Sequence, residues 1–101
     1  MKFQNIDPIE VKKKIDSERP FLLLDVRTPG EYQQRHIANA RLIPLHELPN
    51  RYQELDPHQE TVVICEHGIR SLKACEFLTR SGFTSVYNML GGMSRWVFKD
   101  V

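Results

Sequence analysis

Cysteine is scarce in this sequence, and its two cysteines, Cys65 and Cys75, cannot form a disulfide framework. The 2 cysteines and 4 histidines also lack the paired spacing that is typical of metal sites. We expect two free thiols, and a single bridge between the two cysteines is the alternative. Nothing in the sequence signals a metal or an organic cofactor.

The chain also lacks an excess of charge and a long apolar run. Lysine and arginine number 14 against 13 acidic residues, a net charge of +1, whereas proteins that bind nucleic acid or anionic membranes usually carry a basic excess. No apolar run is long enough to span a bilayer. Residues 1–8 contain no apolar signal-peptide core. We therefore expect a cytoplasmic protein that binds neither nucleic acid nor membranes.

Repeats, low-complexity tracts and linkers are absent as well. A length of 101 residues suits one domain. With 41% hydrophobic and 27% charged residues, the chain has the composition of a protein that buries a core. The sequence therefore predicts a single domain over residues 1–101.

Short apolar or β-branched runs predict strands at residues 21–26, 41–43, 61–65 and 85–88. Helical patterns alternate with these runs. Strands that alternate with helices indicate an α/β domain with a mainly parallel central sheet and helices on both faces.

The predicted helices have recognisable beginnings and ends. The first starts at the cap Asp7-Pro8, and the second starts at a capping box formed by Thr28 and Glu31. A third helix is expected over residues 49–55, and a fourth runs for about ten residues from near Ser71 to the glycine turn at Ser81-Gly82. Helical spacing predicts two apolar faces, in the first helix and in a last helix: Ile9, Val11 and Ile15, then Met93, Trp96 and Val97.

The stretch from Val63 to Ser71 is the one that suggests chemistry. Cys65 ends a predicted buried strand, a short loop with a glycine follows, and a helix begins. Parallel sheets bind ligands at the carboxyl ends of their strands, where both Asp25 and Cys65 fall. The backbone N–H groups of such a loop and the positive end of the helix stabilise a thiolate or an attached anion. The pattern favours a reactive cysteine, and an ordinary buried residue at a strand end is the alternative.

The loop from Cys65 to Ser71, Cys-x-x-Gly-x-Arg-Ser, resembles the active-site loop of the single-domain rhodanese-like sulfurtransferase family. Other motifs of that family follow in the same order, at residues 23–27, 31–32, 36–40, 43–44, 81–83, 86–87 and 90–92 and at Trp96. The family usually has glycine where this chain has Arg35 and Asn39. Neither position lies in the loop, and asparagine tolerates a positive φ. The resemblance spans nearly the whole chain.

This resemblance implies a rhodanese-like fold and the transfer of sulfane sulfur through a persulfide on Cys65, the catalytic nucleophile. The donor would be thiosulfate, a polysulfide or a protein persulfide, and the acceptor a thiol or cyanide. A sulfur-carrier protein is a further candidate partner. Asp25 and Arg27 are expected to support the loop. The remaining loop residues are expected to bind substrate: Glu66, His67, Gly68, Ile69, Arg70 and Ser71.

Two features of the loop, its length and its cysteine, favour the sulfurtransferase over two alternatives. Cell-cycle phosphatases and tyrosine phosphatases carry Cys-x5-Arg around a tetrahedral phosphate, whereas Cys65 and Arg70 form Cys-x4-Arg. The shorter loop favours sulfur over phosphate or arsenate, so a phosphatase or arsenate reductase is the less favoured enzyme. A catalytically inactive rhodanese-like binding module is the other alternative, although inactive relatives usually lack the loop cysteine.

Other side chains have structural interpretations, and for two of them an alternative stays open. Asp25 either pairs with Arg70 or binds neighbouring backbone, and Arg70 either contacts substrate or only braces the loop. Cys75 is expected to be a small buried hydrophobe. His36 is expected to be structural and Trp96 to lie in the core.

Glu66 and His67 directly follow the nucleophile. His67 is either a solvated loop residue or a group that transfers a proton. A carboxylate at position 66 would repel dianionic thiosulfate. We therefore expect thiosulfate to be a poor donor and a polysulfide or protein persulfide to be preferred.

Overall fold

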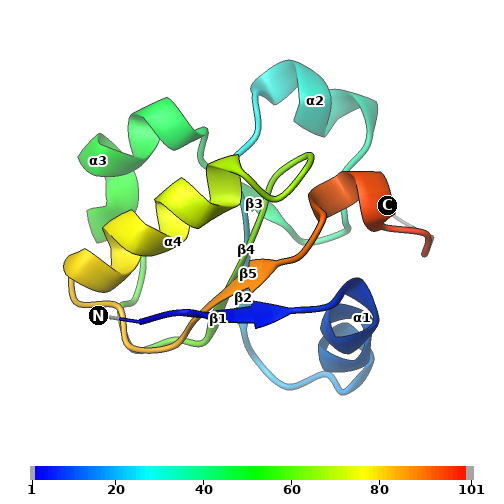
Figure 1. Cartoon of the computed structure of the whole chain (residues 1–101), viewed down its shortest axis with the longest axis horizontal. Coiled ribbons are helices and arrows are strands. Elements are labelled where there is room, and N and C mark those ends of the chain that lie inside the picture. Colours follow the sequence, from blue (N-terminus) through cyan, green and yellow to red (C-terminus); the bar gives the residue numbers. More distant parts are fainter. Residues whose placement is uncertain (1, 100–101) are drawn as a thin grey trace.

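The computed structural model describes residues 2–99 and contains a five-stranded sheet with helices on both faces (Figure 1). The order of the strands is β1-β5-β4-β2-β3, and every pairing between neighbours is parallel. The strands are β1 (Gln4–Ile6), β2 (Leu22–Asp25), β3 (Arg41–Leu42), β4 (Thr61–Ile64) and β5 (Val86–Met89). The predicted α/β class with a parallel sheet is confirmed.

Helices cover the two faces unequally (Figure 1). The helices are α1 (Pro8–Asp16), α2 (Pro29–Gln34), α3 (Leu48–Arg51) and α4 (Arg70–Arg80), and the short 3-10 turns are η1 (Leu45–Glu47), η2 (Tyr52–Glu54) and η3 (Gly92–Arg95). Leu48 of α3 and Leu78 of α4 pack on one face of the sheet. Val11 of α1 and Met93 of η3 pack on the other.

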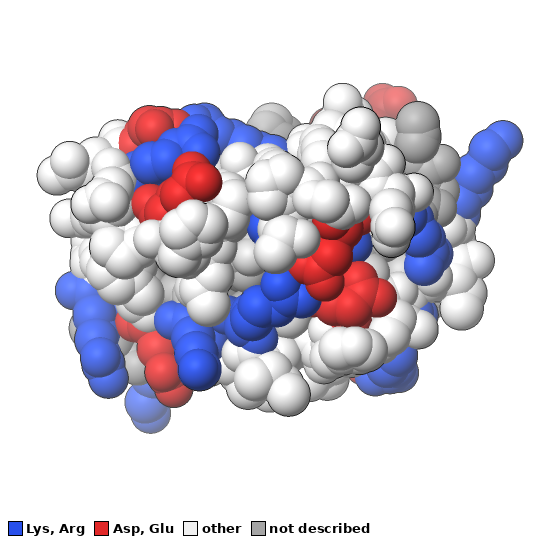
Figure 2. Space-filling model, turned by 90° about the horizontal axis from the view of Figure 1, so that it is seen from above, with Lys and Arg blue, Asp and Glu red and all other residues white. Residues whose placement is uncertain are grey.

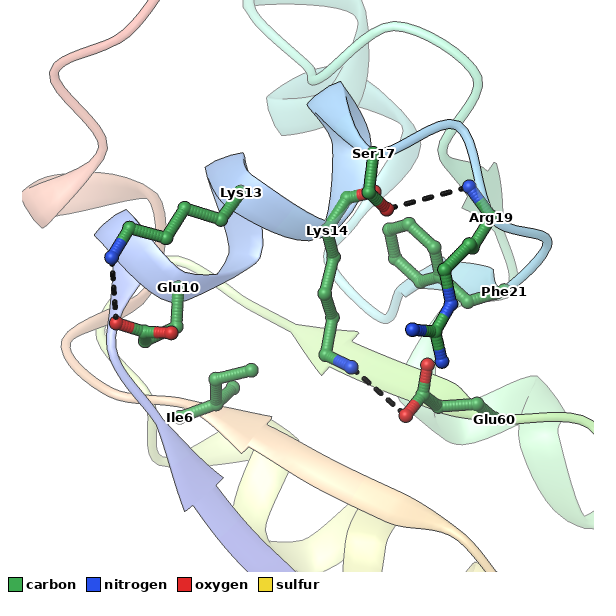
Figure 3. A pocket seen from close by; sticks show the side chains of 8 residues that line it. All are labelled: Ile6, Glu10, Lys13, Lys14, Ser17, Arg19, Phe21 and Glu60. Carbon is green, nitrogen blue, oxygen red and sulfur yellow. Dashed lines mark hydrogen bonds and ion pairs between the residues drawn. The ribbon is translucent and has the colours of Figure 1, made fainter.

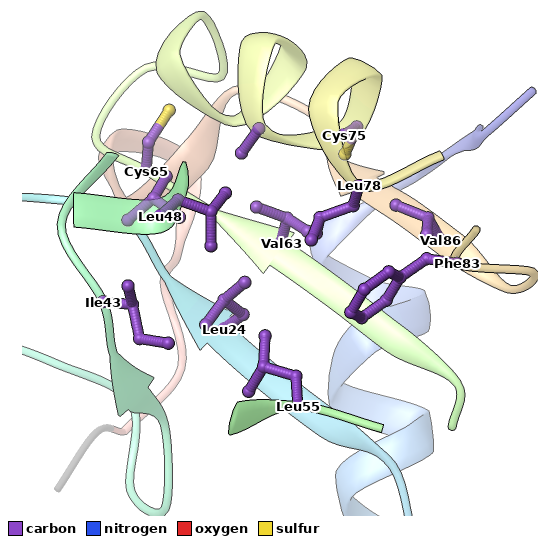
Figure 4. Packing of buried hydrophobic residues seen from close by; sticks show 12 residues of the cluster. Leu24, Ile43, Leu48, Leu55, Val63, Cys65, Cys75, Leu78, Phe83 and Val86 are labelled. Carbon is purple, nitrogen blue, oxygen red and sulfur yellow. The ribbon is translucent and has the colours of Figure 1, made fainter. Parts of the chain in front are cut away.

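The central strand β4 is buried on both faces because its neighbours and the helices cover it completely. Val63 packs under α4 with Leu24 and Leu78, as Figure 4 shows, while Val62 and Ile64 face the opposite cluster. A continuous apolar run is typical of a parallel strand in this position. The burial fixes the point at which the chain leaves the sheet, at Cys65.

The predicted apolar face of the first helix is only partly confirmed. Val11 is fully buried and Ile15 packs against the same cluster, whereas Ile9 is 48% exposed. The predicted helix over 49–55 is split into α3 and η2. Strand β1 was missed, because it is a three-residue edge strand with only one buried side chain.

The expectation of a last helix is wrong. The chain forms only the short η3 turn, after which Trp96 has extended backbone (φ −80°, ψ 111°) and Val97 is 82% exposed. Arg35 donates to the carbonyl oxygens of Met93 and Trp96. The Met93 carbonyl also accepts from the Trp96 N–H at 3.0 Å, which closes the last 3-10 turn before the backbone becomes extended. Trp96 is nevertheless buried in the core, as expected.

Within residues 2–99, none of the helices has the length and apolar character that crossing a membrane requires.

Candidate active site

The loop between β4 and α4 holds the Cys65 sulfur at the carboxyl edge of the sheet, in the upper part of Figure 1. The backbone N–H groups of Gly68 and Ser71 donate to Sγ at 3.0 and 3.3 Å. The sulfur points away from the aliphatic cluster beneath it (Figure 4). Cys65 is only 1% exposed. The loop thus surrounds the sulfur with donors and leaves it little contact with bulk solvent.

A glycine turn fixes this loop from behind. The N–H groups of Met93 and Ser94 donate to the carbonyl oxygens of Cys65 and Glu66 at 2.8 and 2.9 Å. Gly92 must lack a side chain, because a Cβ there would lie 2.4 Å from the Cys65 carbonyl oxygen. The turn after β5 therefore sets the position of the first residues of the loop.

The Ser71 side chain adds a third polar contact to the sulfur. Cys65 Sγ donates to Ser71 Oγ at 3.3 Å. The Ser71 hydroxyl donates in turn to Oδ1 of Asn88 on β5, and Nδ2 of Asn88 donates to Oδ1 of Asn5 on β1 at 3.2 Å. Sequence analysis placed Asn88 in a strand and assigned it no role in the site. A buried amide within the otherwise apolar pattern of β5 was the available signal.

Of the two alternatives for Asp25, the ion pair with Arg70 is wrong, because Arg70 binds another carboxylate. Its two terminal nitrogens instead bind the two carboxylate oxygens of Glu31, each at 2.8 Å. Glu31 is placed by the capping box that the sequence predicted, in which Thr28 accepts from Glu31 N and donates its own N–H to the Glu31 carboxylate. The Arg70 hydrogen bonds lower the pKa of Glu31 to about 2, and the Glu31 hydrogen bond raises that of Arg70. This bidentate pair joins α2 to the start of α4.

Asp25 instead binds Arg27. It accepts from the Arg27 backbone N–H at 3.0 Å, which is the neighbouring-backbone alternative that the sequence left open. It also accepts from the Arg27 side chain at 2.7 to 3.1 Å. Arg27 is 2% exposed and also donates to the Arg35 carbonyl oxygen at 2.7 Å. Its Nη1 lies 3.2 Å from Oε1 of Glu66. The buried Asp25–Arg27 pair thus holds the side chain of the first residue after the nucleophile.

The tip of the loop faces solvent. Ile69 is 66% exposed, and His67 is also exposed. Gly68 takes a positive φ of 92° and sits close to Gly91, where a Cβ would lie 3.1 Å from the Gly91 nitrogen. The six residues expected to bind substrate therefore divide: Gly68 and Ser71 contact the sulfur, Glu66 and Arg70 pair with other elements, and His67 and Ile69 form the rim.

Cys75 is a fully buried free thiol on α4, as expected of a small core residue. Burial raises the pKa of its thiol to about 12, with smaller contributions from Cys65 and Glu76. Cys65 is also a free thiol. Two free cysteines were predicted, and this is confirmed.

His36 and Asn39 lie away from the sulfur and shape the chain after α2. The His36 ring stacks on Tyr32 at 3.8 Å, and its Nδ1 lies 2.7 Å from the Tyr32 carbonyl oxygen. Asn39 has a φ of 71°, the left-handed conformation that asparagine tolerates. Both arrangements agree with structural roles.

Two pockets differ in their relation to the loop. One of about 250 Å³ lies beside it, lined by Arg27, Glu31, Gln34, Arg35, Glu66 and Met93. Another of about 260 Å³ lies between α1 and the start of β2 (Figure 3). There Lys14 pairs with Glu60 at 2.9 Å and Lys13 with Glu10 at 3.5 Å, so these lysines are neutralised locally. Among the described side chains, no cluster of three or more His, Cys, Asp or Glu could hold a metal ion.

The surface above the loop has no broad region of one charge. Figure 2, which looks down on the top of Figure 1, shows acidic and basic side chains touching near the middle of this face. Such an arrangement gives little support to binding of a polyanion.

Fold and loop together define a small parallel α/β domain with a cysteine held by backbone N–H donors at the carboxyl edge of its sheet. The chain matches the model of the Rhodanese-like domain over residues 7–99. A sulfurtransferase of Allochromatium vinosum is 34% identical over 91 residues, which cover 90% of this chain and 85% of that protein. Thiosulfate sulfurtransferase GlpE of Coxiella burnetii is 30% identical over 96 residues, which cover 95% and 89%.

A solved structure agrees with these relatives. The crystal structure of a rhodanese-like domain protein from Staphylococcus aureus has a TM-score of 0.88 and 32% identity, covering 93% of this chain and 91% of that one. The chain therefore belongs to the rhodanese-like domain family, and the resemblance of its loop to that family is confirmed.

Proposed function

We propose that this protein is a rhodanese-type sulfurtransferase in which Cys65 carries sulfane sulfur as a persulfide. The observation that carries the proposal is the convergence of the Gly68 and Ser71 N–H groups on Cys65 Sγ. Preorganised donors of this kind stabilise a negative charge on the sulfur and need no reorganisation during the reaction. The relatives named as sulfurtransferases support the same class.

The proposed reaction has two displacements at sulfur. The Cys65 thiolate attacks the outer sulfur of thiosulfate, a new S–S bond forms, and the old S–S bond breaks with its electron pair leaving on sulfite. Cyanide or a thiolate acceptor then attacks the outer sulfur of the persulfide. The Cys65 thiolate is restored, and thiocyanate or a new persulfide leaves. Charge and electrons balance in each step without a cofactor.

The surroundings of Arg70 support sulfur rather than phosphate chemistry. A phosphatase of this loop type needs its arginine to grip the phosphate oxygens, whereas both terminal nitrogens of Arg70 bind Glu31. We infer that Arg70 braces the loop. A catalytically inactive binding module would not use the Cys65 sulfur. The experiment below distinguishes such a module from an enzyme.

The donor proposal follows from the charge beside the nucleophile. Glu66 carries a carboxylate next to Cys65, so we propose that thiosulfate is a slow donor and that a polysulfide or a protein persulfide is preferred. One relative is named for thiosulfate, so thiosulfate belongs in the test as a donor. The proposed acceptors are a thiol, cyanide or a sulfur-carrier protein.

Intact mass after incubation with thiosulfate or polysulfide tests the function. We expect one added sulfur atom that a reductant or cyanide removes, and thiocyanate as the product with cyanide. Cys65→Ala should lose the adduct and the activity. Cys75→Ala, the matched control, should keep both, because Cys75 lies on α4 outside the loop and burial raises the pKa of its thiol to about 12.

An unchanged mass in the wild-type protein would refute the enzymatic proposal. Equal loss of activity in the two folded variants would show that Cys75 takes part in the chemistry.

A further inference from the structure

A chain of polar side chains leads from the Cys65 sulfur to the edge of the sheet. Cys65 Sγ donates to Ser71, Ser71 donates to Asn88, and Asn88 donates to Asn5. The first three residues are each no more than 2% exposed, whereas Asn5 is exposed. Every one of these hydrogen bonds runs outward from the sulfur.

This outward direction fits only the neutral thiol. A thiolate or a persulfide has no S–H group, so its sulfur can only accept, and the Ser71 hydroxyl has a single proton to give. If that hydroxyl turned to the sulfur while Asn88 kept its orientation, the oxygen atoms of Ser71 and Asn88 would face each other with no proton between them. Leaving buried acceptors unpaired in this way is unfavourable.

An asparagine removes this conflict because the two ends of its amide are alike in shape and opposite in function. A half-turn of the Asn88 amide would point Nδ2 at Ser71 and Oδ1 at Asn5. A matching half-turn of the Asn5 amide is easy, since Asn5 is exposed. All the hydrogen bonds would then run inward, and the Ser71 hydroxyl would donate to the sulfur.

We propose that Asn88 is a positioning residue of this site, and that the chain Ser71–Asn88–Asn5 reverses its hydrogen bonds when Cys65 loses its proton or gains a sulfur. The inference rests on the proposed function only in taking Cys65 as the nucleophile. Asn88 acts through Ser71, because its described hydrogen bonds go to Ser71 and Asn5 and not to the sulfur itself.

A substitution at the exposed Asn5 can hold the hydrogen bonds of the chain in one direction. In Asn5→Asp the amide becomes a carboxylate, which accepts but cannot donate at neutral pH. Asn88 must then keep Nδ2 towards position 5 and Oδ1 towards Ser71, which holds the hydroxyl away from the sulfur. We expect the midpoint of the Cys65 alkylation rate against pH to rise by about half a unit to one unit, the equivalent of one hydrogen bond.

Three variants distinguish the direction of the hydrogen bonds from the added charge and from loss of the contact between Asn5 and Asn88. Gln4→Glu adds the same charge to the preceding residue of β1, whose side chain points to the other face of the sheet, and should leave the midpoint unchanged. Asn5→Ala frees Asn88 to turn and should also leave it unchanged. Ser71→Ala keeps the backbone N–H but removes the hydroxyl, so in that background Asn5→Asp should have no effect.

Peptide mapping separates alkylation of Cys65 from that of Cys75. The titratable and charged groups around the loop are the same in all these proteins: Asp25, Arg27, Glu31, Glu66, His67, Arg70 and Cys75. The proposal is supported if the alkylation midpoint of Cys65 rises only with Asn5→Asp and if Ser71→Ala abolishes that rise. It is overturned if the midpoint rises equally in Gln4→Glu or Asn5→Ala, does not rise at all, or still rises in the Ser71→Ala background. Alkylation needs no sulfur donor, so failure of the wild-type protein to form a persulfide would refute the proposed function and leave this result standing.

Discussion

Replacing Glu66 with glutamine should speed the reaction with a charged donor. The Glu66 carboxylate lies 3.2 Å from Arg27, but Asp25 already binds the same guanidinium with contacts of 2.7 to 3.1 Å. One positive charge thus stands between two negative ones. The group keeps a net charge of about −1 at neutral pH, and Glu66→Gln removes this surplus beside the nucleophile with little change of shape.

The size of the gain follows from Coulomb's law. A single carboxylate at about 6 to 10 Å repels a dianion by about 1.4 to 0.8 kcal/mol in water-like dielectric, so kcat/KM for thiosulfate should rise about ten- to fourfold at low salt. The repulsion is proportional to the charge of the donor. An alkyl thiosulfonate, which is a monoanion, should gain only about the square root of that factor, roughly three- to twofold. At physiological ionic strength the thiosulfate gain should fall to about threefold or less.

The assay is thiocyanate formation from cyanide, with each donor varied at low and moderate salt. Asp16→Asn is the matched control, because it removes an exposed carboxylate at the far end of α1. The reasoning is refuted by no gain with thiosulfate, by equal gains with the two donors, or by a gain that salt does not reduce. Each of these results would mean that the charge of Glu66 does not set donor preference.

Two further predictions concern the cysteines and the pair that joins α2 to α4. Iodoacetamide at neutral pH should label Cys65 and leave Cys75 unlabelled until the protein is unfolded, because burial raises the pKa of Cys75 to about 12. Peptide mapping measures the two labelling rates, and equal rates in the native protein would contradict this prediction. Arg70 lowers the pKa of Glu31 to about 2 from 4.5, so the contribution of the pair to the free energy of unfolding should be complete above pH 4.5 and lost as the pH falls to 2. Urea unfolding should show Glu31→Gln to be less stable by about 1 kcal/mol at pH 7, since solvent screens the half-buried pair, and a difference that persists at pH 2 would refute the assignment.

The parts of the site that are contiguous in sequence could be predicted. Cys65, the loop glycine and the start of α4 lie within a few residues, the strand before them is a continuous apolar run, and the helix after them has one buried face. The capping box at Thr28 is equally local, and it was predicted correctly. Short-range rules suffice where a few neighbouring residues determine the geometry.

The long-range partners could not be predicted in this way. Glu31 was recognised only as a helix cap, yet its carboxylate binds Arg70, which lies 39 residues away. Asn88 meets Ser71 across 17 residues and Asn5 across 83. Such pairings depend on the order of strands in the sheet. The contact at Trp96, where a helix was predicted, is equally distant, since Arg35 donates to the carbonyl oxygen of this extended residue from 61 positions away.

The edge position of β1 has a consequence for the order in which the site is completed. In the described sheet β1 pairs only with β5, so the first strand of this sheet has no partner until its last strand has been synthesised. Pairings between such distant segments are expected to form late in folding, because the loop between them must close first. The sheet can assemble around β4 beforehand, and the loop can close over Cys65. Asn5 reaches Asn88 only when β1 docks, so the first strand of the sheet supplies the last contact of the site.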